Sequence, residues 1–321
     1  MGKTLLERIK TKSIRNKKSQ LFTVLVILLI SLMFVSFEVF SFIYERNTVK
    51  ARVDTMDNFL FSVEKNLERQ MYISGFRILF LAGEHITSTG SYIDVDDFFN
   101  EAFFNGTVGG NSSDIMNGAT YDDLIDSINQ KAKKINVNIT LSNSSIAVAQ
   151  EGPWAVNFSL ISDFVMKDKE GLAKWEKKQV ISAIIPISNF EDPLYTVNTY
   201  AKVSVKIAQT PYEGNYTNGS DVTNLFSHVD SNYYAANPSA PSFLKRLEGN
   251  LSADANGIES FVKIPDLSKQ GLPTSTKSNI DYVYFSSNNP TFYSVSGMPS
   301  WFRIDGQDGH LEKYNVSSLI T

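Results

Sequence analysis

The 321-residue sequence contains no cysteine. A disulfide framework, a thiolate zinc site and a cysteine nucleophile are therefore excluded. Histidine is also scarce, because the three that occur, His85, His228 and His310, are far apart in the sequence. The sequence has no glycine-rich phosphate loop, no H-E-x-x-H, no G-x-S-x-G and no EF-hand loop. These absences predict a protein that is not an enzyme and that uses no cofactor.

Two groups of aspartates are the nearest approach to a metal site. Asp94, Asp96 and Asp97 lie close together but lack the later ligands of a calcium loop. We interpret them as acidic residues at the start of a helix, where they face the positive end of its dipole. Asp305 and Asp308 lie in a glycine-rich stretch and are typical of turns. We therefore predict no metal site.

Charge is nearly absent from residues 21–44, where Glu38 is the only charged side chain. Residues 1–20 hold seven Lys or Arg and one acid, a net charge of +6, whereas the whole chain carries −4. The remaining residues therefore carry −10. This asymmetry across an apolar stretch is typical of a membrane protein, so the basic residues do not indicate nucleic-acid binding.

The apolar stretch Leu21–Tyr44 has 24 residues, about 36 Å of helix, which is enough to cross a bilayer core of about 30 Å. We predict a retained transmembrane helix, with a cleaved secretory signal as the alternative. Because the basic residues precede it, we expect the N-terminus in the cytoplasm and the rest of the chain outside. Glu38 is interpreted as a carboxylate near the interface, or alternatively as half of an ion pair with a neighbouring subunit.

Proline does not occur before Pro153, and glycine is missing between Gly2 and Gly75. Over the same region apolar residues recur with heptad spacing, which predicts an amphipathic stalk helix over residues 45–86. The apolar positions are Val49, Val53, Met56, Leu60, Val63, Leu67, Met71 and Ile78. They pack either against the chain's own globular body or against other copies, and the sequence leaves both alternatives open.

Beyond residue 90 the sequence predicts two helices and then strands. Asp94 is placed to cap a helix over Val95–Phe104, and Thr120 with Asp123 forms a capping box for a helix over Tyr121–Lys134. Alternating apolar residues then predict an antiparallel sheet. Its expected strands are Ile135–Leu141, Trp154–Met166, a partner strand that ends at Ile185, and Ala201–Ile207.

The remaining segments have weaker patterns. We expect a loop over residues 212–224 and a short helix over Ser242–Glu248. Strands are predicted at Phe261–Ile264 and Tyr282–Phe285, and a hairpin is predicted from Trp301–Ile304 and His310–Tyr314.

Nine Asn-x-Ser/Thr sequons follow the apolar stretch, whereas chance predicts roughly four or five. The excess favours a glycosylated exterior, with compositional accident as the alternative. The candidate asparagines are Asn105, Asn111, Asn138, Asn143, Asn157, Asn215, Asn218, Asn250 and Asn315.

The junction Lys17-Lys18-Ser19-Gln20-Leu21 resembles the class III, or prepilin-type, signal of archaeal type IV pilin-like proteins. In that family a basic stretch and a small residue, usually Gly or Ala, precede the cleavage site, and the apolar segment follows it. The resemblance implies that a membrane-bound prepilin-type peptidase cuts between Ser19 and Gln20. It also implies partners that are copies of this chain or other pilin-like subunits.

These observations predict an α+β fold in which a long N-terminal transmembrane and stalk helix is followed by a β-rich, antiparallel extracellular head with a few short helices. The expected segments are a leader (1–19), a transmembrane helix (20–44), a stalk (45–86) and a head (87–321). The leading hypothesis is a pilin-like subunit or minor pilin of a surface filament, with a glycosylated head used in adhesion or contact. The alternatives are a static single-pass surface receptor and an ectoenzyme.

Overall fold

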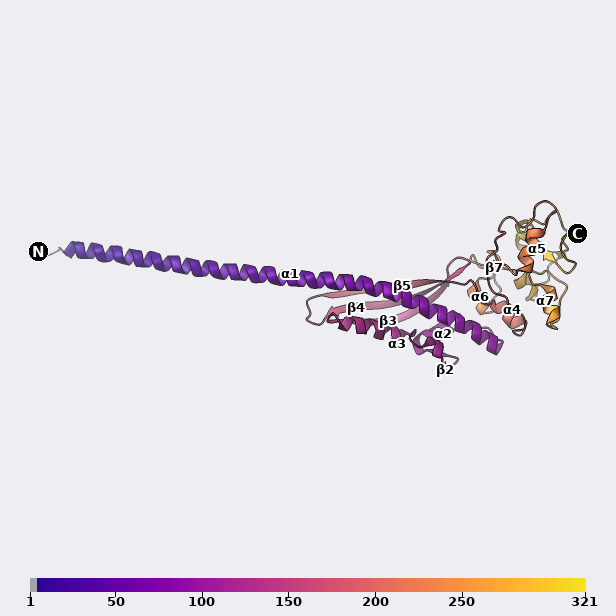
Figure 1. The fold of residues 1–321 in the computed structure, drawn as a ribbon, viewed down its shortest axis with the longest axis horizontal. Helices are drawn as coiled ribbons and strands as arrows, with labels where there is room; N and C mark the ends of the chain where they lie inside the picture. The colour runs from indigo at the N-terminus through magenta and orange to yellow at the C-terminus, as the bar shows by residue number, and fades with distance from the viewer. Residues whose placement is uncertain (1–4) are drawn as a thin grey trace. The chain divides into compact units, whose positions relative to one another are not determined.

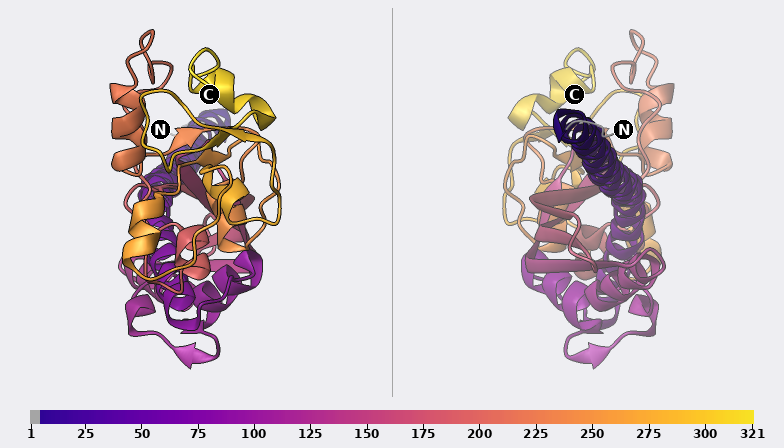
Figure 2. Two further views of the ribbon diagram at one scale, coloured as in Figure 1. Left: turned by 90° about the vertical axis from the view of Figure 1, so that its right-hand side faces the viewer. Right: turned by 90° about the vertical axis from the view of Figure 1, so that its left-hand side faces the viewer.

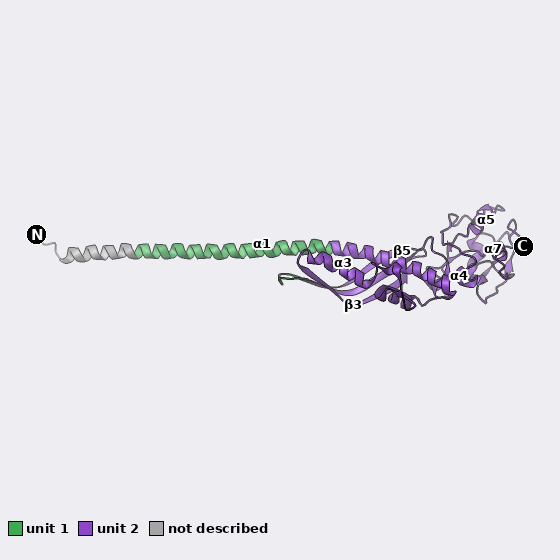
Figure 3. Cartoon of the chain, turned by 60° about the horizontal axis from the view of Figure 1, so that its bottom comes forward, with its two compact units in different colours: residues 1–61, 168–174 green, residues 62–167, 175–321 purple. Residues whose placement is uncertain are grey.

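The computed structural model describes the backbone of residues 5–321 and the side chains of residues 20–321. The chain divides into two compact units (Figure 3), and helix α1 (Leu5–Thr89) contributes to both. The first unit comprises Met1–Phe61 with Asp168–Lys174, and the second comprises Ser62–Lys167 with Trp175–Thr321.

Short elements follow α1 along the chain (Figure 1). The helical ones are α2 (Val95–Asn100), the π-helical turn η1 (Glu101–Asn105), η2 (Asp114–Met116), α3 (Tyr121–Lys133), α4 (Pro193–Asn198), α5 (Thr223–Asp230), α6 (Phe243–Leu247), α7 (Ile264–Lys269), α8 (Asp281–Tyr284), η3 (Gln307–Gly309) and α9 (His310–Lys313). The strands are β1 (Thr107–Val108), β2 (Asn111–Ser112), β3 (Val137–Gln150), β4 (Ala155–Asp168), β5 (Lys174–Pro186), β6 (Ala235–Ala236), β7 (Ile258–Glu259), β8 (Phe292–Tyr293) and β9 (Ile304–Asp305).

Helix α1 ends three residues later than the sequence predicts. Its last residue is Thr89, and Gly90 follows in the left-handed conformation with φ +67°. The N–H group of Gly90 donates to the carbonyl of Ile86 at 2.8 Å. A glycine accepts this conformation without steric cost, so it terminates the helix.

The three long strands form one sheet in the order β3-β4-β5. They confirm the three strands predicted between residues 135 and 185, because period-two alternation over many residues is a strong strand signal. In β4 every second side chain is buried, from Val156 to Met166. The sheet therefore has a covered inner face and an outer face whose side chains are exposed or half-buried.

Within the second unit, α1 packs closely on the inner face of the sheet. A Cβ atom on Gly75 would lie 2.3 Å from Cδ1 of Ile185 and 2.9 Å from Cδ1 of Phe158. The next residue back, Ser74, is buried and its hydroxyl donates to the carbonyl of Ala119 at 2.6 Å. Glycine at position 75 therefore allows a helix-to-sheet distance that no larger residue permits without rearrangement.

Both predicted helix starts before the sheet are confirmed. Asp94 accepts the N–H of Asp97 at 2.9 Å and caps α2. Thr120 and Asp123 form the predicted capping box of α3. The helix predicted over Val95–Phe104 changes at residue 101 into the π-helical turn η1.

Residues 187–321 form the C-terminal region of the second unit, and residues 62–167 with 175–186 form its sheet region. Short helices and loops make up most of the C-terminal region (Figure 2). The short helix predicted over Ser242–Glu248 is confirmed as α6. This part of the predicted head therefore contains less strand than expected. The long strands of the head all lie in the sheet region, and the strands of the C-terminal region are two residues long each.

The strand predicted over Ala201–Ile207 is wrong. Tyr200 and Ala201 both have positive φ angles, +55° and +57°, which turn the chain where a strand needs extended backbone. Only an isolated bridge between Glu191 and Lys206 remains. Val205 and Ile207 are both buried because a short extended stretch around Lys206 points them to the same side, and this stretch is too short to form a strand.

Three further strand predictions fail in the C-terminal region. Phe261–Ile264 forms one bridge at Phe261 and then enters α7, which has proline in its first turn. Tyr282–Phe285 is mostly helix α8. In the predicted hairpin, His310–Tyr314 is instead helix α9 with its cap, so β9 pairs with β8. His310 and Tyr314 are both buried, and a spacing of four residues places them on one helical face.

Candidate functional site

The apolar part of α1 is exposed on all sides. Within the described residues 20–321, one helix, Gln20–Thr89, is long and apolar enough to cross a membrane. Apart from Val26, every large apolar side chain between Leu21 and Tyr44 is 49–76 % exposed. A soluble protein does not leave so large an apolar surface in water, so this segment is a candidate membrane anchor.

The residues of the predicted cleavage site are at the edge of what the structure describes. Lys17, Lys18 and Ser19, with the rest of the 1–19 leader, lie outside the described side chains. Gln20 is within α1 and exposed.

The heptad positions of the stalk separate into two groups. Val49 is 36 % exposed and Val53 is half-buried. The other six positions are buried by the chain itself, and none is more than 8 % exposed. They are Met56, Leu60, Val63, Leu67, Met71 and Ile78. The chain's own body therefore covers the heptad seam from Met56 onward, and no seam is left there for a second copy.

A different face of α1 presents aromatic side chains to the exterior. Tyr72, Phe76 and Phe80 are 41 %, 43 % and 44 % exposed. Their four-residue spacing places them in one row, which we call the aromatic ridge. The ring of Phe76 lies 6.4 Å from that of Tyr72 and 5.3 Å from that of Phe190. This spacing was visible in the sequence, but the heptad pattern obscured it.

An ion pair in the first unit connects α1 to the β4–β5 turn. Nη2 of Arg52 lies 2.5 Å from Oδ1 of Asp168, and Nε donates to the same oxygen at 2.6 Å. Burial alone raises the pKa of Asp168, but the hydrogen bonds from Arg52 and from the N–H groups of Leu172 and Glu170 outweigh it and lower that pKa. Sequence analysis missed this contact, because Arg52 and Asp168 are 116 residues apart.

A groove of about 770 Å³ lies beside the last turns of α1 in the second unit. Its lining includes Phe80 and Phe190 together with His85, Glu191 and Lys206. The hydroxyl of Thr89 donates back to the carbonyl of His85 at 2.8 Å, so this carbonyl at the end of the helix has a hydrogen-bond partner within the helix itself. The groove combines apolar walls with charges of both signs.

Two buried networks of charged residues stabilise the C-terminal region. In the first, Nη1 of Arg246 lies 2.6 Å from Oδ2 of Asp192 and 2.9 Å from Oδ2 of Asp281. All three side chains are fully buried. The hydroxyl of Tyr234 donates to Asp192 at 2.7 Å, and that of Ser260 to Asp281 at 2.8 Å. Burial alone lowers the pKa of Arg246, but its two carboxylate partners outweigh this and raise it, so the guanidinium stays charged.

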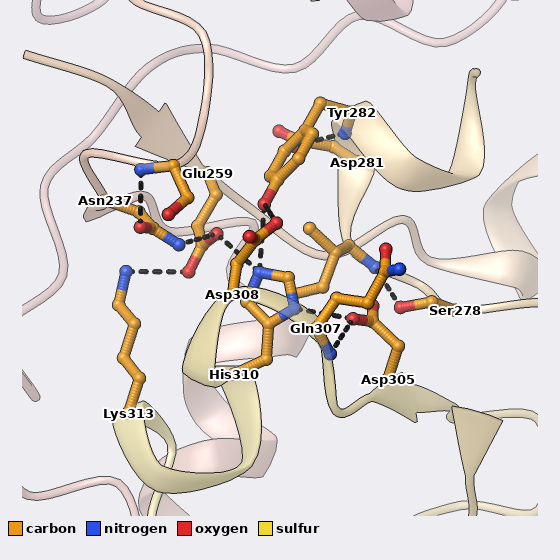
Figure 4. A network of polar contacts seen from close by, with 12 residues as sticks. Asn237, Glu259, Ser278, Asp281, Tyr282, Asp305, Gln307, Asp308, His310 and Lys313 are labelled. Atoms are coloured by element: carbon orange, nitrogen blue, oxygen red, sulfur yellow. Dashed lines mark hydrogen bonds and ion pairs between the residues drawn. The ribbon is translucent and has the colours of Figure 1, made fainter. Parts of the chain in front are cut away.

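The second network is centred on His310 and Glu259 (Figure 4). Nδ1 of His310 lies 2.8 Å from Oδ1 of Asp305, and Nε2 lies 3.3 Å from Oε2 of Glu259. Lys313 donates to Oε1 of Glu259 at 2.6 Å. Tyr314 also donates to Oε1, at 2.9 Å. The network therefore joins β7, β9 and α9.

The charges in this second network reinforce one another. Burial alone lowers the pKa of His310, but its hydrogen bonds to Asp305 and Glu259 raise it to about 10. Burial likewise raises the pKa of Glu259, but His310 and Lys313 lower it to about 2. His310 is therefore an imidazolium at neutral pH, and both of its ring nitrogens donate. A different environment surrounds His228, where burial lowers the pKa to about 3.

These networks hold the fold together and offer nothing to a substrate. The side chains of Arg246, Glu259, Asp305 and His310 are fully buried, so a ligand does not reach them. Among the described residues, no three His, Asp or Glu side chains are grouped so that they hold a metal ion. Sequence analysis missed both networks, because the contacts between their side chains join residues 21 or more positions apart in the sequence, except for Asp305 and His310, which are five apart.

The predicted glycosylation sites are mostly accessible. Of the nine sequon asparagines, eight are exposed and Asn157 is half-buried. Asn138 projects from β3 between the buried Val137 and Ile139. The accessibility of the sequons is thus compatible with modification.

We compared the chain with protein-family models, with characterised proteins and with solved structures. None of the three comparisons found a match.

Proposed function

We propose that this chain is a pilin-like subunit or minor pilin of an archaeal surface filament, with a glycosylated head that serves adhesion or contact. The observation that carries the proposal is α1, a single helix that is apolar and exposed between Leu21 and Tyr44 and packed against its own sheet further along. Such a helix serves first as a membrane anchor. It later packs against identical helices, since helix contacts replace lipid contacts with little loss of apolar burial.

The aromatic ridge supports the same function. The heptad seam is occupied by the chain's own body from Met56 onward, so contacts between copies require another surface. Tyr72, Phe76 and Phe80 provide one, and exposed aromatic side chains are enriched at the centres of protein interfaces. In this proposal the head lies outside the cell and the ridge contacts a neighbouring subunit.

A static single-pass receptor is the second candidate. The groove of about 770 Å³ beside the end of α1 favours it, because ligand sites are concave and largely apolar. In that case the chain keeps its leader and remains in the membrane.

The N-terminus of the chain purified from native membranes separates the two functions. The pilin-like function predicts, by mass spectrometry, a chain that begins at Gln20 and has lost residues 1–19. A leader retained in the whole population contradicts it and favours the receptor. Protease added to intact cells tests the orientation, and we expect it to remove the head. A head that stays protected in the cytosol overturns both functions.

A further inference from the structure

The outer face of the sheet carries an apolar patch, and three sequons lie on the same face. Val180 and Ile184 of β5 are 60 % and 56 % exposed. A flat and exposed apolar sheet surface promotes association with other chains unless something covers it. The three sequons are those of Asn138, Asn143 and Asn157, as the following contacts show.

Hydrogen bonds across the sheet locate Asn157 beside the patch. The hydroxyls of Ser159 and Ser182 lie 2.8 Å apart, so these residues face each other across β4 and β5. In antiparallel strands, two residues back on β4 then lie opposite two residues forward on β5. Asn157 therefore faces Ile184. By the same register Ile161 faces Val180, and such pairs have Cβ atoms about 4.5–5.5 Å apart.

The other edge of the sheet brings two more sequons to this face. Nδ2 of Asn143 donates to Oδ2 of Asp163 at 2.8 Å, and Asp163 alternates with the inward-facing Phe164. Asn143 therefore lies on the outer face. Asn138 lies there too, because it projects away from the core between Val137 and Ile139. All three strands thus contribute to one surface, the outer sheet face, which we define by Asn138, Asn143, Asn157, Ile161, Val180 and Ile184.

We infer that N-linked glycans on Asn138, Asn143 and Asn157 cover the outer sheet face and keep its apolar patch from associating with other chains. A glycan is bulky and strongly hydrated, so it keeps other chains away from the exposed apolar side chains beneath it. At Asn157 the local geometry suits a sequon, because the hydroxyl of Ser159 donates to Oδ1 of Asn157 at 3.0 Å. This inference rests on the proposed exterior location and names the sequons that matter most.

The chemistry is a glycosyl transfer from a lipid-diphosphate-linked glycan. Nδ2 of the asparagine forms a bond to C1 of the first sugar, and the bond between C1 and the diphosphate oxygen breaks. The lipid diphosphate departs, and the amide proton passes to a base of the transferase. The chain supplies only the acceptor amide and the hydroxyl two residues further on.

Peptide mass spectrometry of the full chain from native membranes tests the modification. All three sequons lie in one tryptic peptide, residues 135–167, and cleavage after Glu151 separates Asn157 from the other two. We expect added glycan mass on both fragments. The variant Asn157→Gln should lose it from residues 152–167, and so should Ser159→Ala, whereas Ser159→Thr keeps the sequon and the mass. Unmodified asparagine at all three positions overturns the inference, even if the chain begins at Gln20.

Self-association in detergent tests the covering role. The triple variant Asn138→Gln, Asn143→Gln and Asn157→Gln should sediment as larger species than the native chain. Adding Val180→Thr and Ile184→Thr should reverse this. Asn315→Gln, which removes a sequon in the C-terminal region, is the matched control and should sediment as the native chain does. A triple variant that sediments like the control overturns the covering role.

Discussion

The sheet region and the C-terminal region of the second unit have different interiors. In the sheet region the buried polar residues among the described side chains are Ser74 and Ser162, and the rest of its core is apolar. The C-terminal region buries Arg246, Glu259 and His310 together with their partners. One region is therefore held by apolar layers, whereas the other combines an apolar cluster with buried charges that need partners.

This difference teaches how each region responds to change. Apolar packing loses stability in proportion to the volume that is removed or added. A buried ion pair is different, because removal of one partner leaves an uncompensated charge in a low-dielectric interior. We therefore expect single charge changes to damage the C-terminal region more than single packing changes damage the sheet region.

The largest effect is expected from Arg246→Met. Asp192 and Asp281 would then be buried without their guanidinium, and the free energy of unfolding should fall by about 3–5 kcal/mol. Urea unfolding of the full chain in detergent, followed by tryptophan fluorescence, measures it. Lys245→Met on the same helix is the control and should cost less than about 1 kcal/mol, because Lys245 is partly exposed. Equal losses in both variants would mean that the buried ion pairs of Arg246 do not stabilise the C-terminal region.

The next largest effect is expected in the pH dependence of stability, which should differ between the two regions. The pKa of His310 rises from its ordinary 6.5 to about 10 on folding. Its stabilisation is therefore present below pH 6.5 and disappears as the pH rises from 6.5 to 10. The free energy of unfolding should decline over that window by about 2–4 kcal/mol. Limited proteolysis at pH 7 and pH 9.5 should cut the C-terminal region first.

The variant His310→Gln is the control for this pH effect. It should be less stable at pH 7 and should lose most of the decline above that pH. A native chain with constant stability between pH 7 and 10 contradicts the assignment of a charged imidazole.

Two glycine variants in α1 test the packing of the sheet region and should have smaller, opposite effects. Gly75→Ala forces a Cβ atom against Phe158 and Ile185 and should cost about 1–2 kcal/mol. Gly83→Ala meets nothing within 4 Å and should stabilise α1 by about 0.5–1 kcal/mol. Thermal unfolding of the two variants gives the comparison. A stabilising Gly75→Ala means that the helix is not closely packed on the sheet.

An effect of similar size to that of Gly75→Ala is expected in the first unit. Arg52→Gln removes the charge that faces Asp168, but backbone N–H groups of the turn still stabilise the carboxylate. We expect a loss of about 1–2 kcal/mol in urea unfolding. The exposed pair of Lys65 and Glu68 provides the control, and Lys65→Gln should change stability by less than about 0.5 kcal/mol. A loss in Arg52→Gln no larger than in the control means that the pair contributes nothing.

The sequence predicts the parts of this fold that repeat a pattern. Residues 155–168 alternate over a full strand, and Thr120 with Asp123 caps a helix from within four residues. These signals are local, so sequence reasoning finds them. The apolar segment Leu21–Tyr44 belongs to the same class of signal, and its exposure agrees with the predicted anchor.

The charge networks could not be predicted in the same way. Arg246 is 54 residues from Asp192 and 35 from Asp281, and no periodicity connects them. The failed strands at Tyr282 and His310 have the same cause. Their short apolar runs suit either a strand or a buried helix turn, and tertiary contacts decide between the two.

The proteins sheared from the surface of intact cells give the most direct test of the central claim, that α1 anchors the chain in the membrane and then packs in a filament. Mass spectrometry of that fraction should find this chain with Gln20 as its first residue. If the chain is instead confined to the membrane fraction and still carries residues 1–19, the account of a filament subunit is contradicted.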